Sequence, residues 1–429
     1  MARVFLSVLG TGDYVECIYK FDDGAESKPT RYVQEATVGR FCQDWDANDK
    51  IVIFTTSQAE IQNWHDHQYD DKSEGQSYQR EGLRSRIDSL GLAAHKSNVM
   101  IPDGKSVDEI WKIFDVIIDN LHDNDEIIFD VTHSFRSIPM LVLVVLNYAK
   151  VLKNIRLSGI CYGAFEVLGP QNKAREIPLA ERKADVFNLT PFVELQDWAT
   201  AIDRFLKAGD ATMAAKLAKS STGDLEIECA EELAKKMLAF TNGLSTCRGK
   251  DFARCARQLR IATAACERPN IRPALRHLLT LLEENLNQFP DDEIKSGLAA
   301  ARWCLDHNLI QQGITILQET VISFLCELAG LDHKNSECRK IAKSAVICRK
   351  KPENEWKFEA AKNPETTRQC VNAINDNQDL MKFLGKQLPK LDSFRNDIDH
   401  AGFTDQTNEP HKFKEALEKA IDAVSEIIK

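Results

Sequence analysis

The fold class of this chain is clearest at residues 127–150, which read IIFDVTHSFRSIPMLVLVVLNYAK. The apolar run 127–131 is typical of a buried strand, and residues 138–150 are apolar nearly all round, which predicts a buried helix. The polar segment 132–136 lies between them. A buried strand that passes through a polar turn into a buried helix indicates an α/β fold.

Other apolar runs on both sides of this segment predict more strands, at residues 3–9, 51–54, 98–101 and 157–162. A helix is expected over 107–121, because Ser106 and Glu109 form a capping box ahead of apolar residues at helical spacing. Residues 69–82 are the most loop-like stretch of the chain. Strands that alternate with helices predict a mainly parallel sheet, and we assign it to a first domain at residues 1–190.

The second half of the chain has a different pattern. After about residue 190 the β-branched runs disappear, and apolar residues recur at helical spacing over 310–328, 391–401 and 413–428. Such stripes are typical of packed helices. We therefore expect an all-helical second domain at residues 191–429.

Composition limits the function classes. A net charge of -10 over 429 residues argues against a broad basic surface for long duplexes, so an RNA partner would be a single strand in a local groove. The twelve cysteines include no CxxC pair, which predicts reduced cysteines with neither a zinc knuckle nor a disulfide framework. The start lacks the basic region of a signal peptide, and the apolar run 138–146 is about half a membrane span. We expect a cytoplasmic protein.

The polar segment after residue 130 is a candidate anion site. Strand ends that lead into helices offer free backbone N–H groups, and ligands bind beyond the carboxyl ends of parallel strands. His133 and Arg136 add donors that suit phosphate or ribose. Equally, Thr132 and Ser134 could simply cap the helix while Arg136 pairs with a surface carboxylate. No Walker loop or GxGxxG is present, so neither a nucleoside triphosphate nor a dinucleotide is expected.

Four segments carry a family resemblance: FLSVLGTGDY (5–14), DVTHSFRSIPM (130–140), ICYGAFE (160–166) and DVFNLTPFVELQDW (185–198). Together they resemble the CRISPR-associated Rossmann-fold (CARF) sensor domains of Csx-type effectors from type III CRISPR systems. The resemblance implies a Rossmann-like domain that binds a cyclic oligoadenylate, with the tetra-adenylate favoured, in a pocket across a homodimer axis. The ligand-binding residues that it implies are Thr11, Gly12, Thr132, His133, Ser134 and Arg136. Ser134 stands where the family motif often has glycine.

A second candidate site lies at FRNDIDH, residues 394–400. Metal-free RNA cleavage needs proton transfer and a cation for the developing phosphorane charge, roles that suit His400 and Arg395. On a regular helix the two lie about 500° apart, off one another's face, whereas Asn396 and His400 share a face. A salt-bridged arginine and a surface histidine are the alternative interpretation.

The spacing R-N-x3-H near the end of a helical domain, after a CARF-like domain, resembles the HEPN ribonucleases. It implies a homodimer whose two motifs form one composite site, built from Arg395, Asn396 and His400 of each chain. The implied activity is messenger-activated, metal-independent cleavage of single-stranded RNA to 2',3'-cyclic phosphates in antiviral defence, with no metal or cofactor. Two alternatives remain: a ligand-binding regulator or scaffold without nuclease activity, and a ring nuclease that degrades the messenger.

Overall fold

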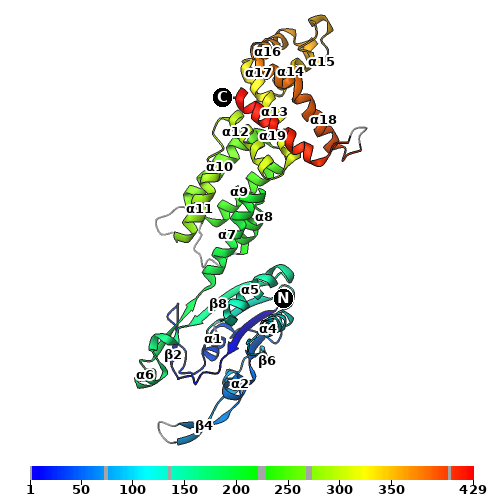
Figure 1. The fold of residues 1–429 in the computed structure, drawn as a ribbon. Helices are drawn as coiled ribbons and strands as arrows, with labels where there is room; N and C mark the ends of the chain where they lie inside the picture. Colours follow the sequence, from blue (N-terminus) through cyan, green and yellow to red (C-terminus); the bar gives the residue numbers. More distant parts are fainter. Residues whose placement is uncertain (1, 72–75, 134–136, 221–228, 267–272, 404–406) are drawn as a thin grey trace. The chain divides into compact units, whose positions relative to one another are not determined.

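The computed structural model describes residues 2–71, 76–133, 137–220, 229–266, 273–403 and 407–429. The chain forms two compact units, Met1–Val193 and Glu194–Lys429. The first is a mostly parallel sheet with helices and the second is helical, which confirms the predicted fold class (Figure 1). Helix α7 (Thr190–Ala208) runs through the sequence boundary between them.

A seven-stranded sheet in the order β2-β9-β8-β7-β1-β3-β6 forms the centre of the first unit. The five predicted strands are all present, and each pairs in parallel with its neighbours in the order β8-β7-β1-β3-β6. They are β1 (Arg3–Leu9), β3 (Lys50–Thr55), β6 (His95–Met100), β7 (Glu126–Asp130) and β8 (Arg156–Gly163). Their carboxyl ends therefore meet at one edge, as a ligand site requires.

Helices cover both faces of this sheet because side chains alternate along each strand. Val4, Leu6 and Val8 of β1 pack toward α4 (Val107–Asp119) and α5 (Ser137–Leu152). The opposite face packs toward α1 (Val33–Phe41) and α3 (Leu83–Ser89). The shorter helices are α2 (Ser57–Ala59), η1 (Glu60–Trp64), η2 (Phe165–Leu168) and α6 (Gln171–Glu176).

Four strands of this unit were not predicted. β9 (Lys183–Asn188) runs antiparallel to β8, and β2 (Ile18–Phe21) pairs in parallel with β9. β4 (His67–Asp71) and β5 (Gln76–Arg80) form an antiparallel pair, so the expectation of a loop over 69–82 is wrong for their described residues. Tyr69 and Tyr78 face each other across this pair with ring centroids 5.6 Å apart, a cross-strand aromatic contact that compensates for the polar sequence.

The prediction that α5 is buried is also wrong. One side, with Val142, Val145, Leu146 and Ala149, is fully buried against the sheet. The other side is exposed within the first unit because α5 belongs to its outer layer. We define the α4–α5 apolar patch by its exposed residues: Trp111, Met140, Val144, Tyr148 and Val151. The ring of Phe114 on α4 contacts both helices of the patch. Its centroid lies 5.5 Å from the ring centroid of Trp111 on α4 and 5.4 Å from that of Tyr148 on α5.

The pairing of β7 with β8 contains an irregularity. Ile127 pairs with Leu157 and Ile128 with Gly159, so Ser158 is an extra residue in β8. Its hydroxyl donates to the carbonyl oxygen of Ile127 at 3.1 Å. The ladder then continues regularly to the site, with Asp130 opposite Cys161.

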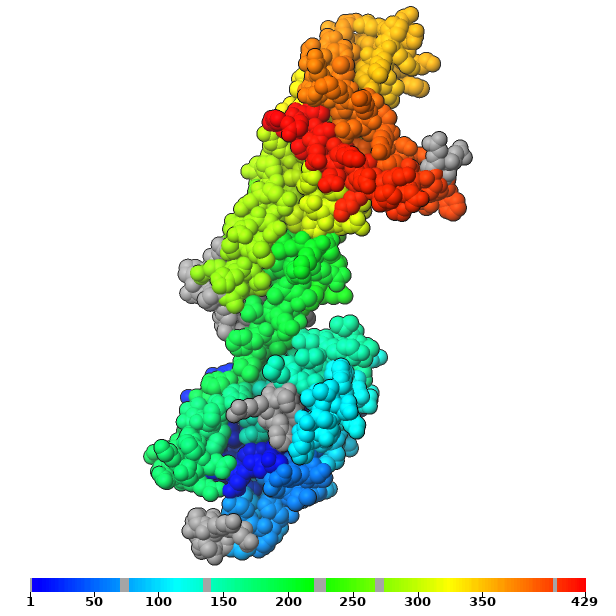
Figure 2. Space-filling view, viewed as in Figure 1, coloured from blue at the N-terminus to red at the C-terminus, as the bar shows by residue number. Residues whose placement is uncertain are grey.

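The second unit packs its helices around an aromatic centre. Trp303 has ring centroids within 5.9 Å of Phe205, Phe240 and Phe289. The last helix, α19 (Pro410–Ile427), packs against α12 (Glu293–Asp306), α13 (Ile310–Leu328), α17 (Gln378–Lys386) and α18 (Leu388–Asp399), and its red surface borders the orange surface in Figure 2. In the described residues no helix has both the length and the apolar character to cross a membrane. The helices are α8 (Thr212–Ser220), α9 (Ala230–Ser245), η3 (Gly249–Asp251), α10 (Phe252–Cys266), α11 (Pro273–Leu286), α12 (Glu293–Asp306), α13 (Ile310–Leu328), α14 (Ser336–Cys348), η4 (Glu353–Glu355), α15 (Phe358–Lys362), α16 (Pro364–Asp376), α17 (Gln378–Lys386), α18 (Leu388–Asp399) and α19 (Pro410–Ile427).

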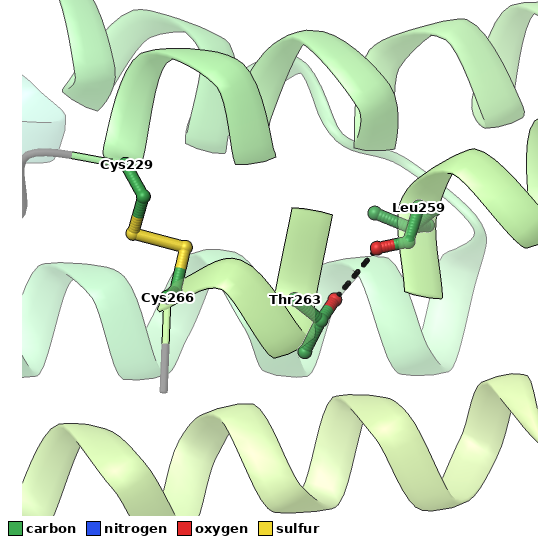
Figure 3. The surroundings of a disulfide bond; sticks show 4 residues. All are labelled: Cys229, Leu259, Thr263 and Cys266. Atoms are coloured by element: carbon green, nitrogen blue, oxygen red, sulfur yellow. Dashed lines mark hydrogen bonds between the residues drawn. A yellow bond between two sulfur atoms is a disulfide. The ribbon is translucent and has the colours of Figure 1, made fainter. Parts of the chain in front are cut away.

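A disulfide joins Cys229 and Cys266, which corrects the expectation that all cysteines are reduced (Figure 3). Cys229 precedes α9 and Cys266 ends α10, and these neighbouring helices bring the two Cα atoms within 5.6 Å. The residues are 37 positions apart in sequence, so only the packing of the two helices, and no local spacing, reveals the pair.

Candidate functional site

A pocket of about 290 Å³ opens where β7 and β8 end. Two of the predicted ligand residues, Thr132 and His133, line it, whereas Thr11 and Gly12 are not in its wall. Ser134 and Arg136 lie outside the described residues. The wall consists of Tyr14, Val15, Tyr19, Arg31, Thr132, His133, Gly163, Phe165, Glu166, Gly169, Pro170 and Gln171.

Thr132 fixes the geometry of the pocket floor. Its hydroxyl donates to Asp130 Oδ1 at 2.5 Å and accepts the Gly163 N–H at 2.8 Å. Burial raises the pKa of Asp130, whose carboxyl also accepts hydrogen bonds from the Thr132 N–H and the Thr37 hydroxyl. Because its hydroxyl already bridges two strand ends, Thr132 acts first as a positioning residue.

Gly163 must be glycine for a steric reason. A Cβ at this position would lie 2.6 Å from Val33 Cγ2 and 3.2 Å from a ring carbon of Tyr19. The close approach lets the Gly163 N–H reach Thr132. No motif marks this role, because it depends on residues far away in sequence.

His133 is the group in the pocket best prepared for a ligand. Its ring lies 4.3 Å from the ring of Tyr14, centroid to centroid, and its Nε2 is buried with no hydrogen-bond partner among the described residues. Burial lowers the pKa of His133 to about 4, so the imidazole is neutral near pH 7. The Nε2 of a neutral imidazole can donate or accept one hydrogen bond with a base or ribose, but the ring carries no charge to neutralise a phosphate.

The turn after β1 contributes through its backbone and through Tyr14. Asn63 Nδ2 donates to the carbonyl oxygens of Gly10 and Gly12, at 2.9 and 3.0 Å, and so fixes the turn that carries Thr11. A Cβ on Gly10 would lie 2.7 Å from the Tyr14 hydroxyl. A Cβ on Gly12 would lie 3.1 Å from a ring carbon of Tyr14, so Gly10 and Gly12 both leave room for the Tyr14 ring beside the pocket.

Arginines supply positive charge around this end of the sheet. Arg31 lines the pocket and donates to the Glu81 carbonyl oxygen at 2.9 Å. Nearby, Asp13 is 2.6 Å from Arg80 and 2.7 Å from Arg175, so two arginines share one carboxylate. The guanidinium of Arg31 suits a phosphate-containing ligand, and Glu166 is the carboxylate in the same wall. Sequence reasoning missed these arginines because they come from separate elements, although Asp13 belongs to the GTGDY segment.

The predicted catalytic residues lie at the end of α18. The helix contains Arg395 and Asn396 and ends at Asp399, with His400 as its C-cap; the His400 N–H donates to the Asn396 carbonyl oxygen at 3.0 Å. Ala401 and Gly402 follow the C-cap with φ +52° and +77°, left-handed conformations that do not continue an α-helix. Since α18 extends through both positions, Arg395 and His400 point about 140° apart around its axis.

Arg395 contacts another helix of the same unit. Its Nη1 donates to Gln318 Oε1 on α13 at 3.3 Å, and its Nε lies 3.6 Å from Asp399 Oδ2. Asn396 and His400 are exposed. Within one chain Arg395 is thus held on the α13 side, while the other two predicted residues face outward.

Comparisons with known proteins agree with the first unit's architecture. Residues 4–166 match the family described as CRISPR system endoribonuclease Csx1, CARF domain. The chain is 23% identical over 385 residues to CRISPR-associated protein MJ1674 of Methanocaldococcus jannaschii, covering 79% of this chain and 57% of that protein. It thus spans little more than half of that relative.

Among solved structures, Enterococcus italicus Csm6 bound to cyclic hexa-2'-fluoro-hexa-dAMP aligns with a TM-score of 0.47 and 12% identity, covering 100% of this chain and 94% of that one. Residues 4–166 therefore match the Csx1 CARF-domain family, and the chain is homologous to a CRISPR-associated protein.

Proposed function

We propose that this protein is a ribonuclease of CRISPR defence that a cyclic oligoadenylate activates. In this proposal residues 1–190 sense the messenger and residues 191–429, as a HEPN domain, cleave single-stranded RNA. The observation that carries the proposal is the pocket with a neutral, unsatisfied His133 in a domain that matches the CARF family.

The sensing step follows from the pocket chemistry. His133 Nε2 would bond a base or ribose of the messenger, and Arg31 would face a phosphate. Thr11, Gly12, Ser134 and Arg136 remain proposed contacts. At about 290 Å³ the pocket is at the small end of ligand sites, too small for a whole ring of four nucleotides. A ligand shared between two chains fits this size.

The α4–α5 apolar patch supports a homodimer. Exposed apolar residues that gather on one face of a protein mark an interaction surface. Residues such as Val144, 60% exposed, and Val151, 88% exposed, would be covered by the same patch of a second chain around a two-fold axis.

The proposed cleavage uses the Arg395, Asn396 and His400 of two chains. The RNA 2'-oxygen attacks the adjacent phosphorus and loses its proton to a base, while the bond from phosphorus to the 5'-oxygen breaks and that oxygen receives a proton. His400 would exchange these protons, Arg395 would stabilise the phosphorane charge, and Asn396 would orient the phosphate or imidazole. Because Arg395 and His400 point apart on one helix, a second chain would complete the set. The products would carry 2',3'-cyclic phosphates.

Cleavage of a fluorescent single-stranded RNA in EDTA tests the proposal, with and without cyclic tetra-adenylate or cyclic hexa-adenylate. We expect messenger-dependent cleavage by the wild type and by His411→Ala, a control at another exposed histidine of this unit. We expect none by His400→Ala. A messenger that binds without RNA cleavage would favour a regulator or scaffold, and loss of the messenger itself would favour a ring nuclease.

A further inference from the structure

The second unit contains a cavity of about 310 Å³ that no sequence motif marked. It lies between η3, α12, α13 and the start of α14. Charged residues dominate its wall: Arg248, Lys250, Asp251, Glu293, Glu319, His333, Lys334 and Arg339. Arg395, Asn396 and His400 are not in this wall, so the cavity is separate from the proposed catalytic residues.

Each carboxylate in the wall already has a cationic partner. Glu293 lies 2.7 Å from Lys334 and 2.9 Å from His333, and Glu319 lies 2.7 Å from both Arg339 and Lys343. Asp251 is likewise 2.8 Å from Arg254. These pairs neutralise the negative charge of the wall.

The pairs also keep the wall ionised and fixed. Burial would raise the pKa of Glu319, but hydrogen bonds from Lys343 and Arg339 outweigh it and hold the pKa below its usual value. Arg339 donates to the Ser323 hydroxyl at 2.7 Å and to the His333 carbonyl oxygen at 3.0 Å. Its guanidinium is thus a fixed positive group.

Two cations at the rim are left over. Arg248 and Lys250 are exposed, and no ion pair or hydrogen bond from either side chain is found within the described part of the chain. They sit in a turn where Cys247 has φ +55°, a conformation that non-glycine residues rarely adopt. In a protein with net charge -10, a cavity with two uncompensated cations at its rim is a local attractor for anions.

The cavity lies next to the helix face that Arg395 contacts. Gln318, which accepts the hydrogen bond from Arg395, and Glu319, which lines the cavity, are consecutive on α13. Consecutive helical residues point about 100° apart, so the two sites occupy adjacent faces of one helix. A bound strand that reaches Arg395 could pass over both.

We propose that this cavity binds a phosphate group of the single-stranded RNA substrate, on a nucleotide close to the one that is cleaved. This inference rests on the proposed ribonuclease function. Arg248 would pair with two phosphate oxygens and Lys250 with one, while the fixed Arg339 faces the cavity interior. The cavity volume suits one nucleotide.

RNA binding and salt dependence test the proposal. We expect Arg248→Gln/Lys250→Gln to weaken single-stranded RNA binding by about tenfold or more, measured by fluorescence anisotropy with messenger present. The slope of log K against log salt should fall by about 0.7 for each phosphate that the variant no longer neutralises. In cleavage assays KM should rise while kcat stays near the wild-type value.

Lys350→Gln/Lys351→Gln is a matched control. It removes the same charge from exposed positions beyond the last turn of α14, whose length places them about 18 Å from the cavity end of that helix. We expect this control to bind RNA like the wild type.

The outcomes separate the two proposals. Equal RNA binding by Arg248→Gln/Lys250→Gln and the control would overturn the phosphate site, even if RNA is cleaved. If Arg248→Gln/Lys250→Gln weakens RNA binding while the control does not, and the wild-type protein cleaves no RNA, the phosphate site is supported and the ribonuclease assignment is overturned. A wild-type protein that binds no RNA would overturn both.

Discussion

Protonation of His133 should destabilise the first unit as the pH falls. In the folded state burial lowers the pKa of His133 from 6.5 to about 4, whereas in the unfolded chain it keeps the ordinary value. Between these values the unfolded state binds more protons, so the free energy of unfolding decreases as pH falls from 6.5 toward 4. Above pH 6.5 the imidazole is neutral in both states and the effect vanishes. At pH 5 the loss amounts to about 2 kcal/mol.

His133→Phe isolates this effect. Phenylalanine retains a ring to stack on Tyr14 and does not titrate, while Asp130 and other carboxyls titrate in both proteins and cancel in the difference. Urea unfolding of the full chain can be followed through the labelling of Cys42 and Cys161, buried thiols of the first unit, with mass spectrometry to identify each. The unfolding free energy of wild type relative to His133→Phe should fall by about 2 kcal/mol between pH 8 and pH 5.

If the difference between the two proteins changes by less than about 0.5 kcal/mol over this pH range, His133 is not buried in a neutral form. The proposed hydrogen bond from its Nε2 to a base or ribose would then lose its physical basis.

Three other perturbations have defined outcomes. Gly163→Ala would place a methyl group 2.6 Å from Val33 Cγ2 and should cost about 1–3 kcal/mol of stability, read by urea unfolding at pH 8; wild-type stability would exclude the steric role. Reduction of the Cys229–Cys266 disulfide, which closes a 37-residue separation, should lower the stability of the second unit by about 4 kcal/mol, and a Cys229→Ser/Cys266→Ser variant should be insensitive to reductant. Val144→Glu in the α4–α5 apolar patch should shift the proposed dimer toward monomer in sedimentation velocity, and an unchanged oligomeric state would place the interface elsewhere.

Burial explains which parts of the fold could be predicted from sequence. β1, β3 and β7 are nearly continuous apolar runs because helices cover both sides of the sheet, and that pattern is visible locally. β2 and β9 are short strands with exposed positions, so their sequences contain no continuous apolar run that would predict a strand. Helix α5 has the composition of a buried helix, but Val144 and Val151 are exposed, which composition cannot reveal.

The candidate pocket was predictable only in part. Asp130, Thr132 and His133 are adjacent in sequence at a strand end, so their convergence follows from strand geometry. Gly163 and Arg31 reach the same pocket from distant segments, and the hydroxyl of Thr132 is occupied by hydrogen bonds that a linear motif does not show. At the second candidate site, spacing along α18 correctly indicated that Arg395 and His400 point apart.

The extra residue in β8 has a consequence for how related CARF domains can change in length. Because Leu157 and Gly159 keep their partners on β7, deletion of Ser158 would flatten the strand and still leave Gly163 beside Thr132. Deletion of one residue between Gly159 and Gly163 would instead shift every later side chain to the other face of the sheet. Relatives should therefore tolerate a gap at the first position and exclude one at the second, which gives sequence alignments a structural anchor.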